Sequence, residues 1–360
     1  MSHSSNDLIK AAAEHADRIN RHDGFKNPHE CESVRFFSSL LLNREMSAYA
    51  VALMMYELGK HSGNSGLNFS IAAHLYAGAY PALKHAQGSI REEISRAIES
   101  GALIANAMTE SGSGSDSFNM KSTAVRQGNS FLLNGSKSFV TNGPVADYYL
   151  LYALTDAAKG FFGGISCFLI DAKKHAIKTG APASKTALRN SPMCELYFND
   201  VIIGEEYLIG KEGAGAMIFM ESMNQERAGI AALHAGAMSR ICESVSRYVK
   251  ERIKGTGTLS DLQGVQFRIA EIAMLTETSR LMSMNAARAL DSGDGTIQAA
   301  KAKVHVSENY VTIAKNTAEL MGGYGIMQNS PYSDLLNDAQ ASLIYSGPND
   351  VLRNLIAANL

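Results

Sequence analysis

The chain has 360 residues, of which 46% are hydrophobic and 19% are charged, and it contains 31 Gly and 7 Pro. This length suggests two or three domains, and the composition excludes a largely disordered protein. The 33 Lys and Arg residues nearly balance the 35 Asp and Glu residues, for a net charge of -2. Because this charge creates no field that would gather nucleic acid or an anionic membrane, neither is expected as a partner.

The cysteines and the N-terminus add two expectations. The four cysteines stand far apart, without a CxxC pair or a histidine at a metal-ligand spacing, so we expect no disulfide framework and no metal site. The first residues lack the basic and apolar segments of a secretory signal, and no stretch reaches the ~18 apolar residues of a membrane span. The sequence therefore predicts a cytoplasmic protein.

Residues 1–103 are expected to form an N-terminal helical domain. Apolar side chains recur at helical spacing over residues 34–59, and an interruption at 43–44 predicts two helices there. Ser70 is a candidate N-cap of a further helix, and residues 89–92, Ser-Ile-Arg-Glu, have the form of a capping box for the next one.

Residues 104–212 are expected to form a middle β domain, because helical periodicity gives way there to short apolar runs. Asn134-Gly135 separates two such runs and predicts a tight hairpin, since both residues tolerate positive φ. Further strands are expected at 148–154, 165–170 and 195–198.

Residues 213–360 are expected to form a C-terminal helical bundle. Long helical patterns run over 214–254, 260–290 and 296–320, and a last helix begins near Pro348. Three long helices and a final one suffice for a four-helix bundle, so the fold class is α+β.

Two glycine-rich segments do not support a nucleotide-binding motif. Gly204 to Lys211 has five residues between its glycines, and Glu212 stands where a phosphate-binding loop carries Ser or Thr. Residues 322–325 lack the third glycine of a dinucleotide fingerprint and follow a helix instead of a strand.

Two segments of the middle domain point to chemistry. Residues 107–116 are a strand end running into a turn of small side chains, whose backbone can approach a flat polar ring closely. Residues 137–143 place an aromatic ring and a hydroxyl two positions apart, on one face of a strand. Taken alone, the first is equally a flexible surface turn and the second an ordinary strand.

Together these segments resemble the acyl-CoA dehydrogenase family, whose flavin loop reads approximately TEP-x-AGSD and whose next strand reads WITNG. The resemblance extends to residues 223–227, at the start of a long helix beside the flavin, and to 318–325, a turn that contacts the cofactor. It also includes 338–339 and 344–350, which match the DA and IYEGT segments, and it covers the chain from about residue 66 onward.

The resemblance implies an FAD enzyme that oxidises an acyl thioester, in a helical N-terminal, middle β-barrel-like and C-terminal four-helix-bundle architecture. A carboxylate removes the α-proton while flavin N5 accepts the β-hydrogen as hydride, and hydrogen bonds to the thioester carbonyl stabilise the developing enolate. The family also implies a homodimer or homotetramer, in which Arg252 and the 319–323 turn reach the neighbouring subunit's FAD. The cofactor-binding candidates are Met108, Thr109, Gly114, Ser115, Phe139, Thr141, Arg252, Glu319, Gly322, Gly323 and Pro348.

The family's usual base is the glutamate of IYEGT, and Ser346 occupies that position here. Some members place the base instead on the long helix, in a Glu-Arg pair that matches Glu226-Arg227, so Glu226 is the candidate base. The alternative is a surface glutamate paired with a neighbouring cation. The substrate-binding candidates are Ser115, Asn224, Arg227, Tyr345 and Ser346.

Several positions depart from the family pattern. Phe139 replaces the flavin-stacking Trp, Pro348 replaces a Thr, the segment after Arg252 lacks the usual Phe-Gly, and Glu319 adds a negative charge where a pyrophosphate would lie. The N-terminal domain also looks shortened before about residue 60. These departures predict weakened FAD binding.

Residues 185–193, the Glu226-Arg227 pair and residues 345–347 are similar to members that act on carrier-protein-bound acyl or aminoacyl groups in polyketide and nonribosomal peptide pathways. An electron acceptor, either a flavoprotein or oxygen, would be a second partner. The alternatives are a dehydrogenase of a free short or branched acyl-CoA, a flavin-poor scaffold protein on the same fold, and a flavin monooxygenase.

Overall fold

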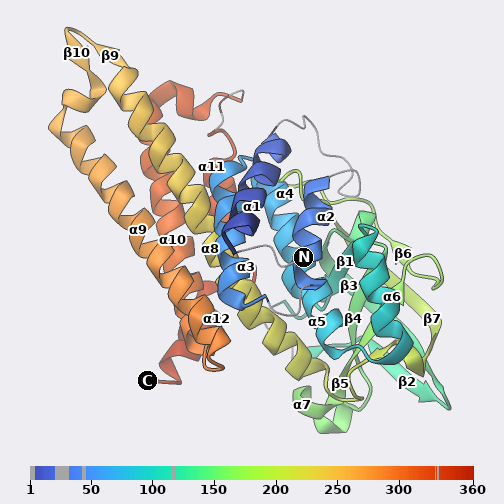
Figure 1. Ribbon diagram of the computed structural model, residues 1–360. Helices are drawn as coiled ribbons and strands as arrows, with labels where there is room; N and C mark the ends of the chain where they lie inside the picture. The colour runs from blue at the N-terminus through green and yellow to red at the C-terminus, as the bar shows by residue number, and fades with distance from the viewer. Residues whose placement is uncertain (1–4, 21–31, 43–45, 115–118, 329, 331) are drawn as a thin grey trace.

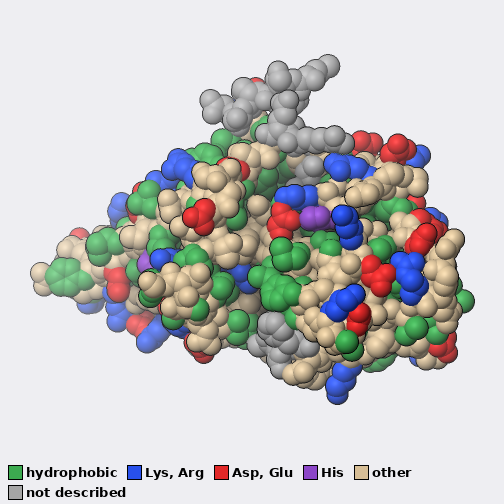
Figure 2. All heavy atoms as spheres, turned by 90° about the horizontal axis from the view of Figure 1, so that it is seen from below, with side chains coloured by type: hydrophobic (Ala, Val, Ile, Leu, Met, Phe, Trp, Pro, Cys, Tyr) green, Lys and Arg blue, Asp and Glu red, His purple; other side chains and the backbone are tan. Residues whose placement is uncertain are grey.

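The computed structural model describes residues 5–20, 32–42, 46–114, 119–328, 330 and 332–360. A set of shorter N-terminal helices lies between a β-sheet and a bundle of long helices, so that the sheet and the tip of the bundle form opposite ends of the molecule (Figure 1). On the face seen in Figure 2, acidic and basic side chains are interspersed and hydrophobic side chains gather near the middle. No helix in the described ranges is long and apolar enough to cross a membrane.

The N-terminal segment is helical, as predicted, and the two helices expected around residues 43–44 are present as α2 and α3. A π-helical segment, Ala73–Ala79, joins α4 to α5. The helices are α1 (Ser5–Asn20), α2 (Glu32–Ser39), α3 (Ala48–His61), α4 (Ser65–Ala72), α5 (Tyr80–His85) and α6 (Gly88–Glu99).

Both predicted helix starts in this segment are wrong. Ser70 lies inside α4, which begins after Asn64, and its Oγ donates to Ser191 Oγ at 2.9 Å. α6 is preceded by Gln87 without a side-chain cap, so Ser89 already lies in the first turn. A serine hydroxyl can form hydrogen bonds inside a helix as well as at its N-cap. The residue type alone therefore does not show at which residue the helix begins.

The middle segment forms a mixed sheet with the order β6-β7-β3-β2-β4-β5-β8, and β1 pairs in parallel with β4. A short turn, α7 (Phe161–Gly164), precedes β5. The strands are β1 (Ile104–Ala107), β2 (Thr123–Gln127), β3 (Ser130–Thr141), β4 (Tyr148–Leu154), β5 (Ile165–Asp171), β6 (Lys178–Thr179), β7 (Met193–Gly204) and β8 (Leu208–Ile209).

The hairpin predicted at Asn134-Gly135 is wrong, because β3 runs through this dipeptide. The chain reverses earlier, at residues 128–129 between β2 and β3. The register of β3 against β7 shifts between Leu133 and Gly135, where Gly135 has φ 144° and a Cβ would lie 2.4 Å from Ser122 Oγ. The positive φ of Gly135 therefore belongs to an irregularity within a strand, where the backbone passes close to Ser122, and not to a turn.

The C-terminal segment is the predicted bundle of long helices. α8, α9 and α10 pack against one another, and α12 packs on α10. The small strands β9 (Ile253–Lys254) and β10 (Gly257–Thr258) form the tip of the bundle, far from the sheet (Figure 1). The helices are α8 (Gly215–Glu251), α9 (Gln263–Asp291), α10 (Thr296–Met321), α11 (Leu335–Ala341) and α12 (Asn349–Ala357).

Candidate active site

Glu226 and Ser346 are brought together although 120 residues separate them. Glu226 lies on α8 with only 5% of its surface exposed, and Ser346 lies in the turn that precedes α12. Ser346 Oγ donates to Glu226 Oε1 at 2.7 Å, while Oε2 is buried and has no hydrogen-bond partner among the described residues. One oxygen is thus held in place and the other is left for a substrate.

Burial raises the pKa of Glu226 from 4.5 to about 7. The hydrogen bond from Ser346 and the positive charges of Arg227 and Lys303 oppose this rise. A carboxyl with a pKa near the working pH is well suited to proton transfer, because it is partly ionised and is also a stronger base than an exposed glutamate. The alternative of a solvated helix glutamate does not fit this burial.

The turn that carries Ser346 is held by two cations from two helices. Ser346 and Gly347 both have positive φ, 57° and 93°. Arg227 Nε donates to Ser346 O at 3.2 Å, and Lys303 Nζ donates to Gly347 O at 2.8 Å. Left-handed backbone at a non-glycine residue costs about 1–3 kcal/mol, so surrounding contacts such as these must maintain it.

Asn224 and Arg227, which were both predicted to bind substrate, belong to one hydrogen-bond network. Arg227 Nη1 donates to Asn224 Oδ1 at 3.0 Å, and Asn224 Nδ2 donates to Thr296 Oγ1 at 2.9 Å. Both side chains are therefore connected to the start of α10, and the guanidinium faces the Ser346 turn.

Lys303 is a member of this cluster that sequence reasoning missed. It is 1% exposed and lies on the apolar stripe of α10. That stripe recurs at helical spacing through Ala299, Val306 and Tyr310, and a charged residue in its middle was the available signal.

Aromatic side chains close the space behind the Ser346 turn. Tyr345 shares a 2.6 Å hydrogen bond with His234 Nε2, and its ring lies 4.3 Å from that of Phe69. Burial lowers the pKa of His234 to about 3, so the imidazole is neutral. Tyr76 packs onto α8 at Gly229, where a Cβ would lie 2.2 Å from the ring. These contacts fix the aromatic side chains beside the turn.

The predicted flavin loop begins at the end of β1 and is anchored by a buried ion pair. Lys137 Nζ donates to Glu110 Oε1 at 2.8 Å and to Met108 O at 3.2 Å. Glu110 also accepts from the backbone of residues 121 and 122. Ser138 N donates to Thr109 O at 2.8 Å, which joins the loop to β3. Residues 108–110 at the start of the loop are therefore fixed both to β3 and to residues 121–122.

Matches to known proteins agree with this architecture. The model of the acyl-CoA dehydrogenase middle domain matches residues 105–201, and that of the C-terminal domain matches residues 213–360. An L-prolyl-[peptidyl-carrier protein] dehydrogenase of Serratia sp. is 35% identical over 318 residues, which cover 88% of this chain and 82% of that protein. The chain belongs to the acyl-CoA dehydrogenase family.

Two further similarities place it within that family. An acyl-CoA dehydrogenase of Bacillus subtilis is 34% identical over 86% of this chain and 81% of its own length. A solved structure of PigA with FAD and proline superposes with a TM-score of 0.94 at 31% identity, covering 100% of this chain and 98% of PigA. This member is accordingly an FAD-dependent oxidoreductase, and the predicted α+β fold is confirmed.

The residues predicted to contact the flavin ring lie on an open surface of the dehydrogenase. Phe139 is 65% exposed, has φ 57° and lies within a shift in the pairing of β3 with β7, between Lys137 and Val140. Thr141 is half-buried, and Val140 between the two is buried, so Phe139 and Thr141 share the exposed side of the strand. A Cβ at Gly114 would meet nothing within 4 Å, and Ser115 lies outside the described residues. An exposed ring beside a fixed loop fits a stacked flavin.

The other predicted cofactor positions lie elsewhere in the dehydrogenase. Arg252 is exposed at the end of α8, and a Cβ at Gly322 or Gly323 would meet no atom within 4 Å, which leaves the backbone open to a ligand. Glu319 Oε2 pairs with Arg268 Nη1 at 2.7 Å. This ion pair offsets the negative charge that was expected to weaken cofactor binding.

These positions do not meet Phe139 within one chain. Arg252 lies beside β9 at the tip of the bundle, whereas Phe139 lies on β3 at the opposite end of the molecule (Figure 1). Pro348 is the N-cap of α12 and directly follows the Ser346 turn. Within one chain, Arg252 and Phe139 are therefore far apart.

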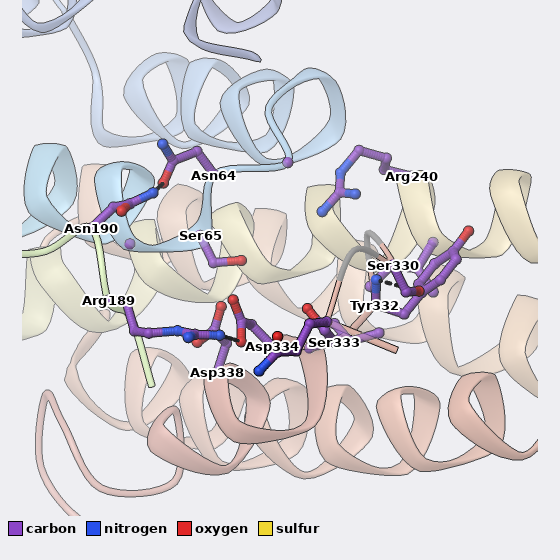
Figure 3. A pocket seen from close by; sticks show the side chains of 15 residues that line it. Asn64, Ser65, Arg189, Asn190, Arg240, Ser330, Tyr332, Ser333, Asp334 and Asp338 are labelled. Carbon is purple, nitrogen blue, oxygen red and sulfur yellow. Dashed lines mark hydrogen bonds and ion pairs between the residues drawn. The ribbon is translucent and has the colours of Figure 1, made fainter. Parts of the chain in front are cut away.

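A cavity of about 670 Å³ in the dehydrogenase is lined mainly by polar residues of the α3–α4 junction, the 189–190 segment, α8 and the region around the start of α11 (Figure 3). Neither Glu226 nor Ser346 lines it. Asp338 Oδ1 accepts from Leu188 N at 2.7 Å, and Arg189 pairs with Asp334. The aspartate of the DA motif therefore anchors the 185–193 segment to α11.

Proposed function

We propose that this enzyme dehydrogenates an acyl or aminoacyl thioester carried by an acyl or peptidyl carrier protein, with Glu226 as the base. The observation that carries the proposal is the buried Glu226 carboxyl, with Oε1 held by Ser346 and Oε2 unpaired among the described residues. When bound, FAD supplies the acceptor for the β-hydrogen, which leaves the substrate as hydride.

The residues around Glu226 favour removal of the α-proton. Glu226 Oε2 takes the proton, and a carbon–carbon double bond forms as the β-hydrogen leaves. Protonation neutralises the carboxyl, so the positive charge of Arg227 beside it is left to stabilise negative charge on the thioester carbonyl. Because Glu226 is buried and Arg227 is only partly exposed, little water screens this charge.

A carrier-bound substrate with a small acyl group is the finer part of the proposal. The Serratia relative acts on L-prolyl-[peptidyl-carrier protein], and the PigA structure holds proline. Beside the Ser346 turn, Tyr345 packs against Phe69 and shares a hydrogen bond with His234, so aromatic rings border the proposed base. An L-prolyl group on a peptidyl carrier protein is therefore the first substrate to test.

The alternative that a specific similarity favours is a free short or branched acyl-CoA, since the Bacillus acyl-CoA dehydrogenase is nearly as similar. Kinetics with one aminoacyl group presented on CoA and on a carrier protein separate the two. The proposal predicts a kcat/KM at least about tenfold higher on the carrier, which corresponds to about 1.4 kcal/mol of recognition. Equal or higher values on CoA would contradict it.

The oligomer is also part of the proposal. Phe267, Met274 and Leu281 are spaced seven residues apart on α9 and are 65%, 63% and 54% exposed. Such a stripe on one helical face suits a second copy of the chain, which would bring its own Arg252 to the Phe139 of the first. A homodimer or homotetramer would thereby complete each FAD site.

The remaining assignments complete the proposal. The domain boundaries are 1–103, 104–212 and 213–360, and electrons leave to a flavoprotein or to oxygen. Cytoplasmic location is supported by Cys167, Cys194 and Cys242, which are free thiols. The visible spectrum of the purified protein is the test against a flavin-poor scaffold, which would be colourless and would not take up FAD.

A further inference from the structure

Lys303 is a buried ammonium that holds the turn beside the base. Its Nζ donates to Gly347 O and to Asn349 Oδ1, both at 2.8 Å. Asn349 is fixed in turn, since its Nδ2 donates to Ser307 Oγ at 3.0 Å. Lys303 forms no ion pair with any carboxylate of the described residues. Burying a charge is costly unless hydrogen bonds or an opposite charge offset the cost, and Gly347 O and Asn349 Oδ1 supply the hydrogen bonds here.

The contacts of Lys303 complement those of Arg227. Arg227 reaches the turn from α8 through Ser346 O, and Lys303 reaches it from α10 through Gly347 O. The two cations therefore fix consecutive carbonyls of a left-handed backbone, and the Ser346 hydroxyl is directed at Glu226 as a result.

We propose that Lys303 is a positioning residue for the base: it holds the Ser346-Gly347 turn against α8 and places a buried positive charge near the Glu226 carboxyl. This inference rests on the proposed role of Glu226.

The charges around the carboxyl determine the direction of the expected effect. Arg227 and Lys303 are the cations that act on Glu226, and both lower its pKa. Tyr76 and Tyr345 also face it, and burial raises the pKa of both phenols, so they are neutral. Removal of the Lys303 charge therefore raises the pKa of Glu226.

The groups that face Lys303 determine its protonation state. Burial and the charge of Arg227 lower the pKa of Lys303 to about 7, while Glu226 and Glu308 oppose that change. His234 faces it as a neutral ring, and Lys303 contributes to keeping its pKa low. The ammonium is thus stabilised mainly by the ionised Glu226, which couples the two charges.

The experiment compares the holoenzyme with Lys303→Met, Lys303→Gln and Lys303→Arg. Lys301→Met is the matched control, because Lys301 is exposed on the same helix. An infrared titration follows the Glu226 carboxyl, whose band is identified by its loss in Glu226→Gln. Anaerobic flavin reduction by the thioester gives a rate and an apparent Kd at each pH.

We expect Lys303→Met to raise the titration midpoint of Glu226 by at least about half a pH unit. Flavin reduction at neutral pH should fall at least about twofold, because the higher pKa halves the amount of carboxylate, with the apparent Kd and FAD content close to those of the parent. Lys303→Arg should restore the midpoint in part, and Lys301→Met should match the parent. If Lys303→Met does not fold, Lys303→Gln must show the same shift.

An unchanged midpoint in the Lys303→Met or Lys303→Gln variant would overturn the inference, as would a loss of rate without any shift. The infrared titration reports on Glu226 whether or not it is the base. If Glu226→Gln reduces flavin as fast as the parent, the proposed function fails, while the midpoint shift still decides the effect of Lys303.

Discussion

At the scale of single residues, Ser346 stands where the family usually has its base and supports the proposed base, Glu226. Its hydroxyl cannot accept the α-proton, but it donates to Glu226 Oε1 and thereby lowers the pKa of that carboxyl. The loss of the family's usual glutamate is thus accompanied by a hydrogen bond that orients the second one.

Ser346→Ala should therefore slow flavin reduction near pH 7 by about two- to tenfold and leave it close to the parent at higher pH. Without the hydrogen bond the pKa of Glu226 rises, so less carboxylate is present at neutral pH. Rates of flavin reduction across pH, with one thioester, measure this. In the Glu226→Gln background, Ser346→Glu should restore part of the rate, and no gain there would show that residue 346 cannot reach the α-proton.

The burial of Glu226 also predicts a pH-dependent cost in stability. The pKa is about 7 in the folded protein and 4.5 without burial, so the folded state binds the extra proton between these values. Stability therefore falls as pH rises through this window and stays lower above it, by at most about 3 kcal/mol.

Glu226→Gln removes this penalty, so its apparent melting temperature should exceed that of the parent more at pH 8 than at pH 5. The exposed Glu251 on the same helix supplies the control, since Glu251→Gln should follow the parent at both values. Parallel curves for parent and Glu226→Gln would show that the carboxyl carries no such penalty.

At the scale of elements, the buried pair of Lys137 and Glu110 fixes the flavin loop to β3. Lys137→Met leaves a carboxylate without its partner in the interior and should cost about 3–5 kcal/mol and much of the bound FAD. Adding Glu110→Gln should recover part of the stability, and Lys121→Met, at an exposed neighbour, should change neither quantity. Thermal unfolding and FAD content report the outcome; full FAD retention in Lys137→Met would contradict the anchoring role.

The elements that sequence predicted well were those with long patterns. The apolar periods of α8, α9 and α10 were sufficient because tertiary packing follows the same stripe over many turns. The predictions at Asn134-Gly135 and Ser89 were wrong because the signals are not unique. Asn-Gly also fits a bulge within a strand, and a serine followed by a glutamate also fits the first turn of a helix. Only contacts distant in sequence decide between these.

In the candidate site, too, the sequence predicted some features, while others depend on contacts between distant segments. Glu226 was predicted through resemblance, but its contact with Ser346 joins two segments that no periodicity relates. Lys303 went unrecognised because a lysine in a helix is most often solvated, and its burial depends on how α8, α10 and the Ser346 turn meet.

At the scale of the whole molecule, the separation of Phe139 from Arg252 requires a second chain to complete the proposed cofactor site (Figure 1). Phe139→Asp and Arg252→Glu should each lose FAD when made alone. Co-produced, they should regain it in about a quarter of sites, because half of randomly paired dimers are mixed and each mixed dimer has one intact site. FAD per chain measures this, and no recovery in the mixture would contradict a site shared between subunits.

Anaerobic flavin reduction by an aminoacyl carrier-protein thioester, in the parent and in Glu226→Gln, tests the central claim most directly. The amide keeps the shape of the side chain but cannot accept the α-proton, so FAD content should persist while the rate falls about 100- to 10,000-fold. Bleaching of the parent together with its loss in the variant is the predicted result. Equal rates in the two proteins, or a parent that binds FAD and is not reduced by any thioester, would contradict the account.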